Sequence, residues 1–156
     1  MLSLLTMKKP LSIVFVCHGN ICRSVAAEMI FKQMLREKGI EGVSVCSRAT
    51  SREEIGHDIY SPMKRALARK GIQYDYHQAR QISLQDYEKA DHVFYMDDMN
   101  RRNLEYMIRD YKHIIQPIFA YTPSINEIED PWYTDRFDLV VDQITRCLED
   151  ILEALS

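Results

Sequence analysis

Two residues with complementary chemistry, Cys17 and Arg23, stand with five residues between them in the string Cys-His-Gly-Asn-Ile-Cys-Arg-Ser at positions 17–24. A cysteine attacks as its thiolate, a form that helix amino ends and neighbouring cations favour. An arginine binds two phosphate oxygens at once and keeps its positive charge. A loop that brings the sulfur and the guanidinium together can bind a phosphate and attack it. The string therefore predicts an active-site loop.

The other residues of this loop suit the same task. Gly19 permits a backbone conformation closed to other residues, which helps successive N–H groups converge on an anion. We expect Asn20 to pin the loop through its side-chain amide and Ser24 to donate a hydrogen bond to the Cys17 sulfur. We expect Ile21 to point toward the entering substrate. Besides the cysteine and arginine, the predicted phosphate-binding residues are His18, Gly19, Asn20, Ile21, Cys22 and Ser24.

The elements on either side of the loop place it where an anion binds. Residues 11–16 form an apolar run typical of a buried strand, and residues 25–35 have the apolar stripe of a helix. The loop therefore lies at the carboxyl end of a strand and the amino end of a helix, where unpaired N–H groups and the helix dipole attract negative charge. The bare spacing C-x5-R occurs by chance, but the full string between these two elements is specific.

The rest of the chain continues the alternation of strands and helices. Further strands are predicted at 43–47, 90–96 and 113–116, and helices at 62–70, 98–111 and 135–155. Such alternation favours a parallel sheet covered on both faces. We expect a single doubly wound α/β domain over residues 11–156, with a four-stranded parallel sheet in flavodoxin-like order, preceded by an N-terminal extension, residues 1–10. Ligands of such sheets bind at the carboxyl ends of the strands, where the strand order reverses.

Composition excludes several other classes of protein. The chain has 156 residues, 46% of them apolar and 28% charged, which is typical of one soluble domain. A net charge of −3 argues against general nucleic-acid binding. No apolar run approaches the length of a membrane span. Lys8 and Lys9 follow the first apolar residues instead of preceding them, unlike the charges of a signal peptide. We expect a cytoplasmic protein that binds neither nucleic acid nor membrane.

The four cysteines show neither the pairing of a zinc site nor the density of a disulfide scaffold. Cys46 and Cys147 are expected to be packing residues. A reducing, cytoplasmic compartment would also keep a catalytic thiol usable. No metal-binding constellation is apparent in the sequence, and we expect neither a metal nor another cofactor.

These residues resemble the low-molecular-weight protein tyrosine phosphatases, whose signature is C-x-G-N-x-C-R-S after a hydrophobic strand. Four further segments are similar to family motifs in the same order: a second-strand serine region, H-x-A-R-Q, M-D-x-x-N and Asp-Pro-aromatic-aromatic. In this chain they are Ser47 to Ser51, His77 to Gln81, Met96 to Asn100 and Asp130 to Tyr133. The resemblance spans residues 12 to 150.

The resemblance implies hydrolysis of phosphotyrosine through a phosphocysteine intermediate. Cys17 would be the nucleophile, Arg23 would hold the phosphate, and Asp130 would act as general acid and then as general base. Such an acid is needed because an unprotonated phenolate departs poorly. Trp132 and Tyr133 would stack on the ring of the substrate.

The resemblance also assigns supporting roles around the loop. His77 would join Asn20 and Ser47 in a hydrogen-bond network that fixes the loop. Asp97 would help to position Arg23, although ordinary helix capping fits this residue as well. A disulfide between Cys17 and Cys22, formed reversibly, would protect the nucleophile from over-oxidation. We state this redox control as a hypothesis.

Two positions depart from the family pattern. Val25 replaces the proline that often follows Ser24, which should alter only the first helical turn. Glu53 stands roughly where some members have a tryptophan on the wall of the substrate cleft. An acidic residue on this wall repels acidic peptides or attracts basic ones.

Three rival functions share parts of this pattern. Thioredoxin-coupled arsenate reductases need further cysteines after the third strand, where this chain has residues 95–98 without a thiol. Protein-arginine phosphatases have a threonine at the position of Ile21. The aliphatic side chain of Ile21 should crowd a guanidinium group and favour a flat aryl ring as the substrate. A phosphotyrosine-binding or phosphocarrier module needs neither Cys17 nor Asp130. We therefore expect an enzyme acting on phosphotyrosine-containing proteins, monomeric, with weak self-association through residues such as Tyr133 left open.

Overall fold

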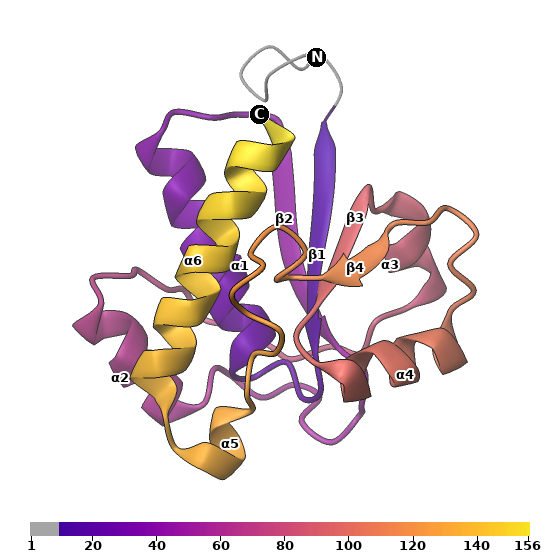
Figure 1. The fold of residues 1–156 in the computed structure, drawn as a ribbon. Helices are drawn as coiled ribbons and strands as arrows, with labels where there is room; N and C mark the ends of the chain where they lie inside the picture. The colour runs from indigo at the N-terminus through magenta and orange to yellow at the C-terminus, as the bar shows by residue number, and fades with distance from the viewer. Residues whose placement is uncertain (1–9) are drawn as a thin grey trace.

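Four parallel strands form the central sheet of the computed structural model, which describes residues 10–156 (Figure 1). Their spatial order is β2-β1-β3-β4, which confirms the predicted doubly wound α/β class and strand order. The strands are β1 (Leu11–Cys17), β2 (Val43–Ala49), β3 (His92–Tyr95) and β4 (Ile115–Pro117). The carboxyl end of β1 lies between β2 and β3, at the point where the strand order reverses, which is where doubly wound folds bind ligands.

The alternating side chains of β1 divide the core into two layers. Ile13 and Phe15 belong to a cluster built with the helices on one face, and Val14 and Val16 to a cluster on the other face. The first face is covered by α1 (Arg23–Glu37), α2 (Ser61–Arg69) and α6 (Phe137–Leu155) (Figure 1). The second is covered by α3 (Leu84–Lys89) and α4 (Asp98–Met107). Helices therefore cover both faces, as predicted.

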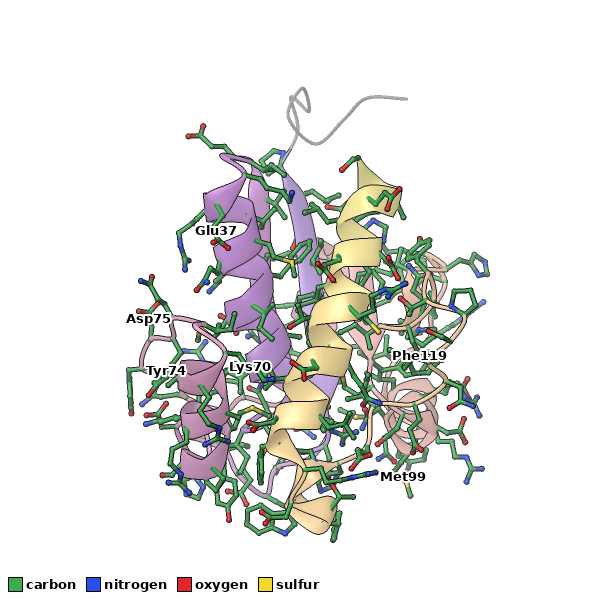
Figure 2. The ribbon with its side chains drawn as sticks, turned by 60° about the vertical axis from the view of Figure 1, so that its left-hand side comes forward. Glu37, Lys70, Tyr74, Asp75, Met99 and Phe119 are labelled. Carbon is green, nitrogen blue, oxygen red and sulfur yellow. The ribbon has the colours of Figure 1, made fainter. Side chains whose placement is uncertain are left out.

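Aromatic and apolar contacts hold α1 against the sheet. Phe15 on β1 packs between Phe31 of α1 and Phe94 of β3, with ring centroids 5.9 Å and 5.8 Å away. The helices α1 and α6 lie side by side over this layer (Figure 2). At the rim, Lys70 lies 3.0 Å from Asp142 of α6, but an exposed pair of this kind contributes about 0–1 kcal/mol. The buried apolar contacts therefore fix the helix that begins at the predicted active-site loop.

Several elements differ from the sequence-based expectation. The helix predicted over 98–111 ends at Met107, because Ile108 takes an extended backbone conformation and is buried against the sheet. Helix α3 was not predicted, although Ser83 and Asp86 form a capping box at its start. The single turn α5 (Pro131–Thr134) interrupts the predicted loop before α6.

Two further findings concern the limits of the chain and its helices. Almost all of the predicted N-terminal extension, residues 1–10, lies outside the described part of the chain. Within residues 10–156, no helix is both long and apolar enough to cross a membrane.

The carboxylate of Asp110 shapes the segment between α4 and β4. It accepts hydrogen bonds from the N–H groups of Ile114 and Ile115 at 2.9 Å and 3.1 Å and from the Tyr87 hydroxyl at 2.7 Å. Burial opposes ionisation of Asp110, but these three donors outweigh it, so its pKa lies below its ordinary value. The carboxylate thus stabilises the entry to the edge strand.

We expect Asp110→Asn to lower the free energy of unfolding by about 1–3 kcal/mol at pH 7, because an amide presents only one acceptor oxygen to three donors. The pKa of Asp110 is depressed in the folded state. Its contribution is therefore fully present above the unfolded pKa of about 3.9 and is lost as pH falls through the folded pKa. Urea denaturation at pH 7 and at lower pH measures the effect, with the exposed Asp75 (Figure 2) changed to asparagine as the control. If the difference in free energy of unfolding between the wild type and Asp110→Asn grows as pH falls, this account is wrong.

Candidate active site

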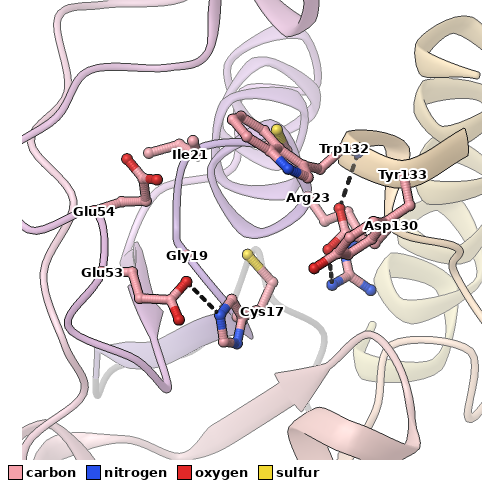
Figure 3. A pocket seen from close by; sticks show the side chains of 11 residues that line it. Cys17, Gly19, Ile21, Arg23, Glu53, Glu54, Asp130, Trp132 and Tyr133 are labelled. Atoms are coloured by element: carbon pink, nitrogen blue, oxygen red, sulfur yellow. Dashed lines mark hydrogen bonds and ion pairs between the residues drawn. The ribbon is translucent and has the colours of Figure 1, made fainter. Parts of the chain in front are cut away.

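The sulfur of Cys17, the last residue of β1, has three hydrogen-bond partners. The backbone N–H groups of Asn20 and Ser24 point to Sγ at 3.3 Å and 3.4 Å, and the Ser24 hydroxyl lies 3.0 Å away. Cys17 itself is buried, and its side chain faces a pocket (Figure 3). N–H groups that converge on one sulfur can stabilise the negative charge that a nucleophilic sulfur carries.

The amino end of α1 is left free for an anion. The helix begins at Arg23, no side chain caps it at Cys22, and its first turn contains no acidic residue. The first N–H groups of a helix have no partners within the helix, and its dipole places partial positive charge there. A phosphate above Cys17 thus meets backbone donors without a competing carboxylate in the first turn.

Arg23 is buried beside the same sulfur and is held from behind. Its Nη1 donates to Oδ2 of Asp97 at 2.6 Å and to the carbonyl oxygen of Ile128 at 2.8 Å. Burial lowers the pKa of Arg23, but the charges of Cys17, Asp97 and Asp130 outweigh it and raise the pKa above its ordinary value. The predicted pairing of Asp97 with Arg23 is therefore present. It fixes one edge of the guanidinium and keeps it charged.

The strained residue of the loop is Asn20, which has a φ of 61°. The special backbone conformation was predicted at Gly19, and this prediction is wrong, because the positive φ is that of Asn20. Asparagine adopts the left-handed region more readily than most residues that have a side chain. Gly19 has a different use. A Cβ at Gly19 would lie 3.3 Å from Cγ of Glu54, so the missing side chain lets Glu54 pack against the loop.

The side chain of Asn20 links the loop to β2 and to the loop's own end. Its Nδ2 donates to Ser24 Oγ at 2.8 Å and to Ser47 Oγ at 2.9 Å. His77 contacts the same residue through the backbone, since its Nε2 donates to the Asn20 carbonyl at 2.7 Å. The structure thus brings together the residues that were expected to support the loop. Ser24 and Ser47 contact the side-chain amide of Asn20, and His77 contacts its backbone carbonyl.

A pocket of about 130 Å³ opens above the sulfur (Figure 3). Trp132 and Tyr133 form one wall, with about half of the Trp132 surface exposed and its ring tilted against that of Tyr60 at 4.8 Å. The carboxylates of Glu53 and Glu54 lie on the opposite side (Figure 3). The full lining is Cys17, His18, Gly19, Ile21, Cys22, Arg23, Glu53, Glu54, Asp130, Trp132 and Tyr133. The pocket thus has an aromatic wall on one side and an acidic wall on the other.

The acidic wall is tied to the loop by one side-chain contact. Nε2 of His18 lies 2.9 Å from Oε2 of Glu53, and both side chains are largely accessible. Glu54, which was not predicted as a site residue, pairs instead with His57. Its position next to Glu53 in the sequence could have indicated that Glu54 also lines the pocket.

Asp130 stands at the rim, where it caps α5. Its Oδ1 accepts the N–H of Trp132 at 3.0 Å, and its Oδ2 lies 3.4 Å from Nη2 of Arg23. The cap orients the carboxyl group toward the pocket that Cys17 also lines. A carboxyl group and a thiol thus line one cavity, an arrangement that could combine general acid catalysis with nucleophilic attack.

Cys22 also lines the pocket. Burial raises the pKa of the Cys22 thiol, and the neighbouring Cys17 and Asp130 raise it further. Burial also raises the pKa of Cys147, to about 11. Within residues 10–156, no three side chains of His, Cys, Asp or Glu gather in a group that would hold a metal ion.

Comparison with protein families matches residues 12–156 to the family described as "Low molecular weight phosphotyrosine protein phosphatase". The chain is 35% identical over 149 residues to the low molecular weight phosphotyrosine protein phosphatase of Gallus gallus, covering 91% of this chain and 94% of that protein. The protein of the same name from Homo sapiens is 36% identical over 149 residues, with the same coverage.

A solved structure gives the same result for the fold. The crystal structure of YfkJ from Bacillus subtilis superposes with a TM-score of 0.89 and 32% sequence identity, covering 94% of each chain. The sequence similarity and the shared fold therefore extend over nearly the whole chain, including every element that positions the pocket.

Proposed function

This chain belongs to the low molecular weight phosphotyrosine protein phosphatases, and from that premise we propose that it hydrolyses protein phosphotyrosine through a phosphocysteine on Cys17. One observation supports the residue assignments: Cys17 with its hydrogen-bonded sulfur, the buried Arg23 and the carboxyl group of Asp130 all line one pocket. The first is the nucleophile, the second binds the phosphate, and the third supplies a proton.

In the first step the Cys17 thiolate attacks phosphorus in line with the bond to the tyrosine oxygen. The S–P bond forms as the P–O bond breaks, and Asp130 gives its proton to the departing phenolate. Arg23 and the loop N–H groups hold the three equatorial oxygens, whose charge they stabilise in the transition state. The products are the substrate protein with an unphosphorylated tyrosine side chain and the phosphocysteine on Cys17.

In the second step water attacks the phosphorus of the phosphocysteine. Asp130, now a carboxylate, takes the proton of the water, and the S–P bond breaks to release phosphate and the Cys17 thiolate. The donors on Sγ stabilise the sulfur as a leaving group in this step. The enzyme returns to its starting state without a cofactor.

The contact between Asp130 and Arg23 supports this sequence of steps. Nη2 of Arg23 faces Asp130 at 3.4 Å, while Nη1 is bound to Asp97 and to the Ile128 carbonyl. A phosphate that takes up Nη2 replaces Asp130 as its partner, which leaves the carboxyl group to the leaving oxygen.

The walls of the pocket support an aryl phosphate as the substrate. Trp132 and Tyr133 offer aromatic surface, and the aliphatic Ile21 borders the same space. The test is hydrolysis of phosphotyrosine and phosphoarginine side by side near pH 6, with acid-quenched samples analysed for a phosphoryl group on the Cys17 peptide. Phosphotyrosine should be preferred, and the adduct should appear on Cys17. Preference for phosphoarginine overturns the reading of Ile21, and an adduct on another residue overturns the mechanism.

We expect Glu53 to favour basic residues beside the phosphotyrosine. Its carboxylate, with that of Glu54, makes the wall opposite Trp132 negative. Two peptides that differ only in lysine or glutamate next to the phosphotyrosine should differ about 5–10-fold in kcat/KM, corresponding to about 1 kcal/mol of a partly screened charge contact. The Glu53→Gln variant should reduce this ratio. An unchanged ratio removes Glu53 from substrate selection.

We also propose that Cys22 protects Cys17 during oxidation. A sulfenic acid on Cys17, formed by peroxide, condenses with the Cys22 thiol to a disulfide and releases water. Wild-type enzyme inactivated by peroxide should regain activity with dithiothreitol, and Cys22→Ser should regain much less. The idea is abandoned if mass spectrometry of the inactivated wild type shows no Cys17–Cys22 crosslink.

We propose a reducing, cytoplasmic compartment, since the mechanism needs a free thiol and all four cysteines are free. Phosphotyrosine-containing proteins are the proposed partners. A monomer remains our expectation, and sedimentation at increasing concentration tests it.

A further inference from the structure

Glu28 is a buried carboxylate that the mechanism above does not use. It lies on α1 with 8% of its surface exposed. A buried charge is costly unless it is paired and hydrogen-bonded. Glu28 has two partners: Oε2 accepts from Nζ of Lys32 at 2.5 Å, and Oε1 accepts from the Ser47 hydroxyl at 2.6 Å. The second partner connects it to the active-site loop.

The chemistry of these groups fixes the direction of each hydrogen bond. An ionised carboxylate only accepts, so the single hydroxyl hydrogen of Ser47 goes to Glu28. Ser47 Oγ is then available only as an acceptor, and it accepts from Nδ2 of Asn20 at 2.9 Å. Glu28 therefore favours the amide nitrogen of Asn20, and not the amide oxygen, as the partner of Ser47.

The same reasoning gives the direction of the hydrogen bonds between Asn20 and Cys17. The backbone N–H of Arg80 donates to Oδ1 of Asn20 at 3.1 Å, which leaves both Nδ2 hydrogens for Ser47 and Ser24. Ser24 Oγ accepts one of them at 2.8 Å, so its own hydrogen is free for the Cys17 sulfur at 3.0 Å. The chain of bonds runs from Cys17 through Ser24, Asn20 and Ser47 to Glu28.

We propose that Glu28 is a positioning residue for the nucleophile: by holding Ser47 as an acceptor, it keeps Asn20 oriented so that Ser24 donates to Cys17. This inference rests on the proposed function for its purpose, but the hydrogen-bond chain is independent of turnover. The catalytic groups remain Cys17, Arg23 and Asp130, and Glu28 acts only through others.

The Glu28→Gln variant should reverse the donor–acceptor direction of the hydrogen bonds between residue 28 and Cys17. The ammonium group of Lys32 only donates, so it will face the new amide oxygen and direct the amide nitrogen at Ser47. Ser47 then receives two donors and has no acceptor for its own hydrogen. This favours turning the Asn20 amide, against the hydrogen bond by which the Arg80 N–H holds its oxygen. A turned amide presents its oxygen to Ser24, whose hydrogen is then withdrawn from Cys17.

The experiment measures the rate of Cys17 alkylation by iodoacetamide as a function of pH. We expect the midpoint of the profile to rise by about one pH unit in Glu28→Gln, since a hydrogen bond to a charged group is of this order. Direct repulsion between Glu28 and the thiolate predicts the opposite sign, because removal of a negative charge lowers the midpoint. A purely structural role leaves the midpoint unchanged and lowers only the free energy of unfolding.

The matched control is the double variant Glu28→Gln with Lys32→Met. Without the ammonium group, the amide oxygen is free to accept from Ser47, and the midpoint should return toward that of Lys32→Met alone. Ser47→Ala, which breaks the chain without touching the buried ion pair, should also raise the midpoint and serves if Glu28→Gln is poorly folded. A midpoint that falls or stays constant in Glu28→Gln or Ser47→Ala overturns the proposal. Since alkylation needs no substrate, this result is separate from the fate of the phosphatase assignment.

Discussion

Replacing Cys17 with serine should abolish turnover of phosphotyrosine, with kcat falling by on the order of 10⁴–10⁶-fold, as in other enzymes that lose their nucleophile. The donors that converge on Sγ stabilise an anion, but a serine hydroxyl does not ionise at neutral pH. The measurement is release of phosphate from phosphotyrosine near pH 6.

The same variant should still bind phosphate, and this separates an enzyme from a binding module. Arg23, its support by Asp97 and the free amino end of α1 are all retained. Titration with inorganic phosphate by calorimetry should therefore give binding within a few-fold of wild type or tighter, because a negative sulfur is absent. Turnover that survives in Cys17→Ser would falsify the phosphocysteine mechanism. Loss of phosphate binding as well means that the variant has disrupted the loop.

Asp130→Asn should reduce kcat/KM for phosphotyrosine by about 10²–10⁴-fold, the usual contribution of a general acid. Asparagine retains the oxygen that caps α5 by accepting from Trp132, so the local fold should persist. The substitution removes the proton that the departing phenolate needs. Initial rates at low substrate concentration report the steps up to the phosphocysteine.

The decisive control for Asp130 is the leaving group. A nitrophenyl phosphate releases a phenolate that departs without protonation, so the defect of Asp130→Asn should be much smaller with it than with phosphotyrosine. Equal defects on both substrates would mean that Asp130 acts by holding Arg23, 3.4 Å away, instead of donating a proton. The pair of substrates thus distinguishes proton transfer from positioning.

The fold and the loop were predictable because their signals are local. An apolar run, a phosphate-binding string and an apolar stripe follow one another over residues 11–35, and each needs only neighbouring residues to be recognised. The strand order followed from the rules for parallel sheets and is confirmed. The prediction for Gly19 was wrong because the backbone conformation of the loop depends on contacts that are not local. Whether Gly19 or Asn20 takes a positive φ depends on partners such as Arg80 and Ser47, far away in the sequence.

Other features depend on tertiary contacts that no local pattern shows. Glu28 looks like an ordinary polar residue of a helix, and only the packing of α1 on β2 buries it beside Ser47. The early end of α4 depends on burial of Ile108 and on the donors that surround Asp110. For α3 the capping box of Ser83 and Asp86 was a usable local signal.

The chain contains a single tryptophan, and it is Trp132, half-exposed at the mouth of the pocket and packed on Tyr60. All indole emission of the protein therefore originates within the site. Ligands that enter the pocket will change the polarity around one fluorophore without a background from elsewhere in the chain. The enzyme carries its own optical probe, with which stopped-flow mixing can follow phosphate binding, formation of the intermediate and product release in unlabelled protein.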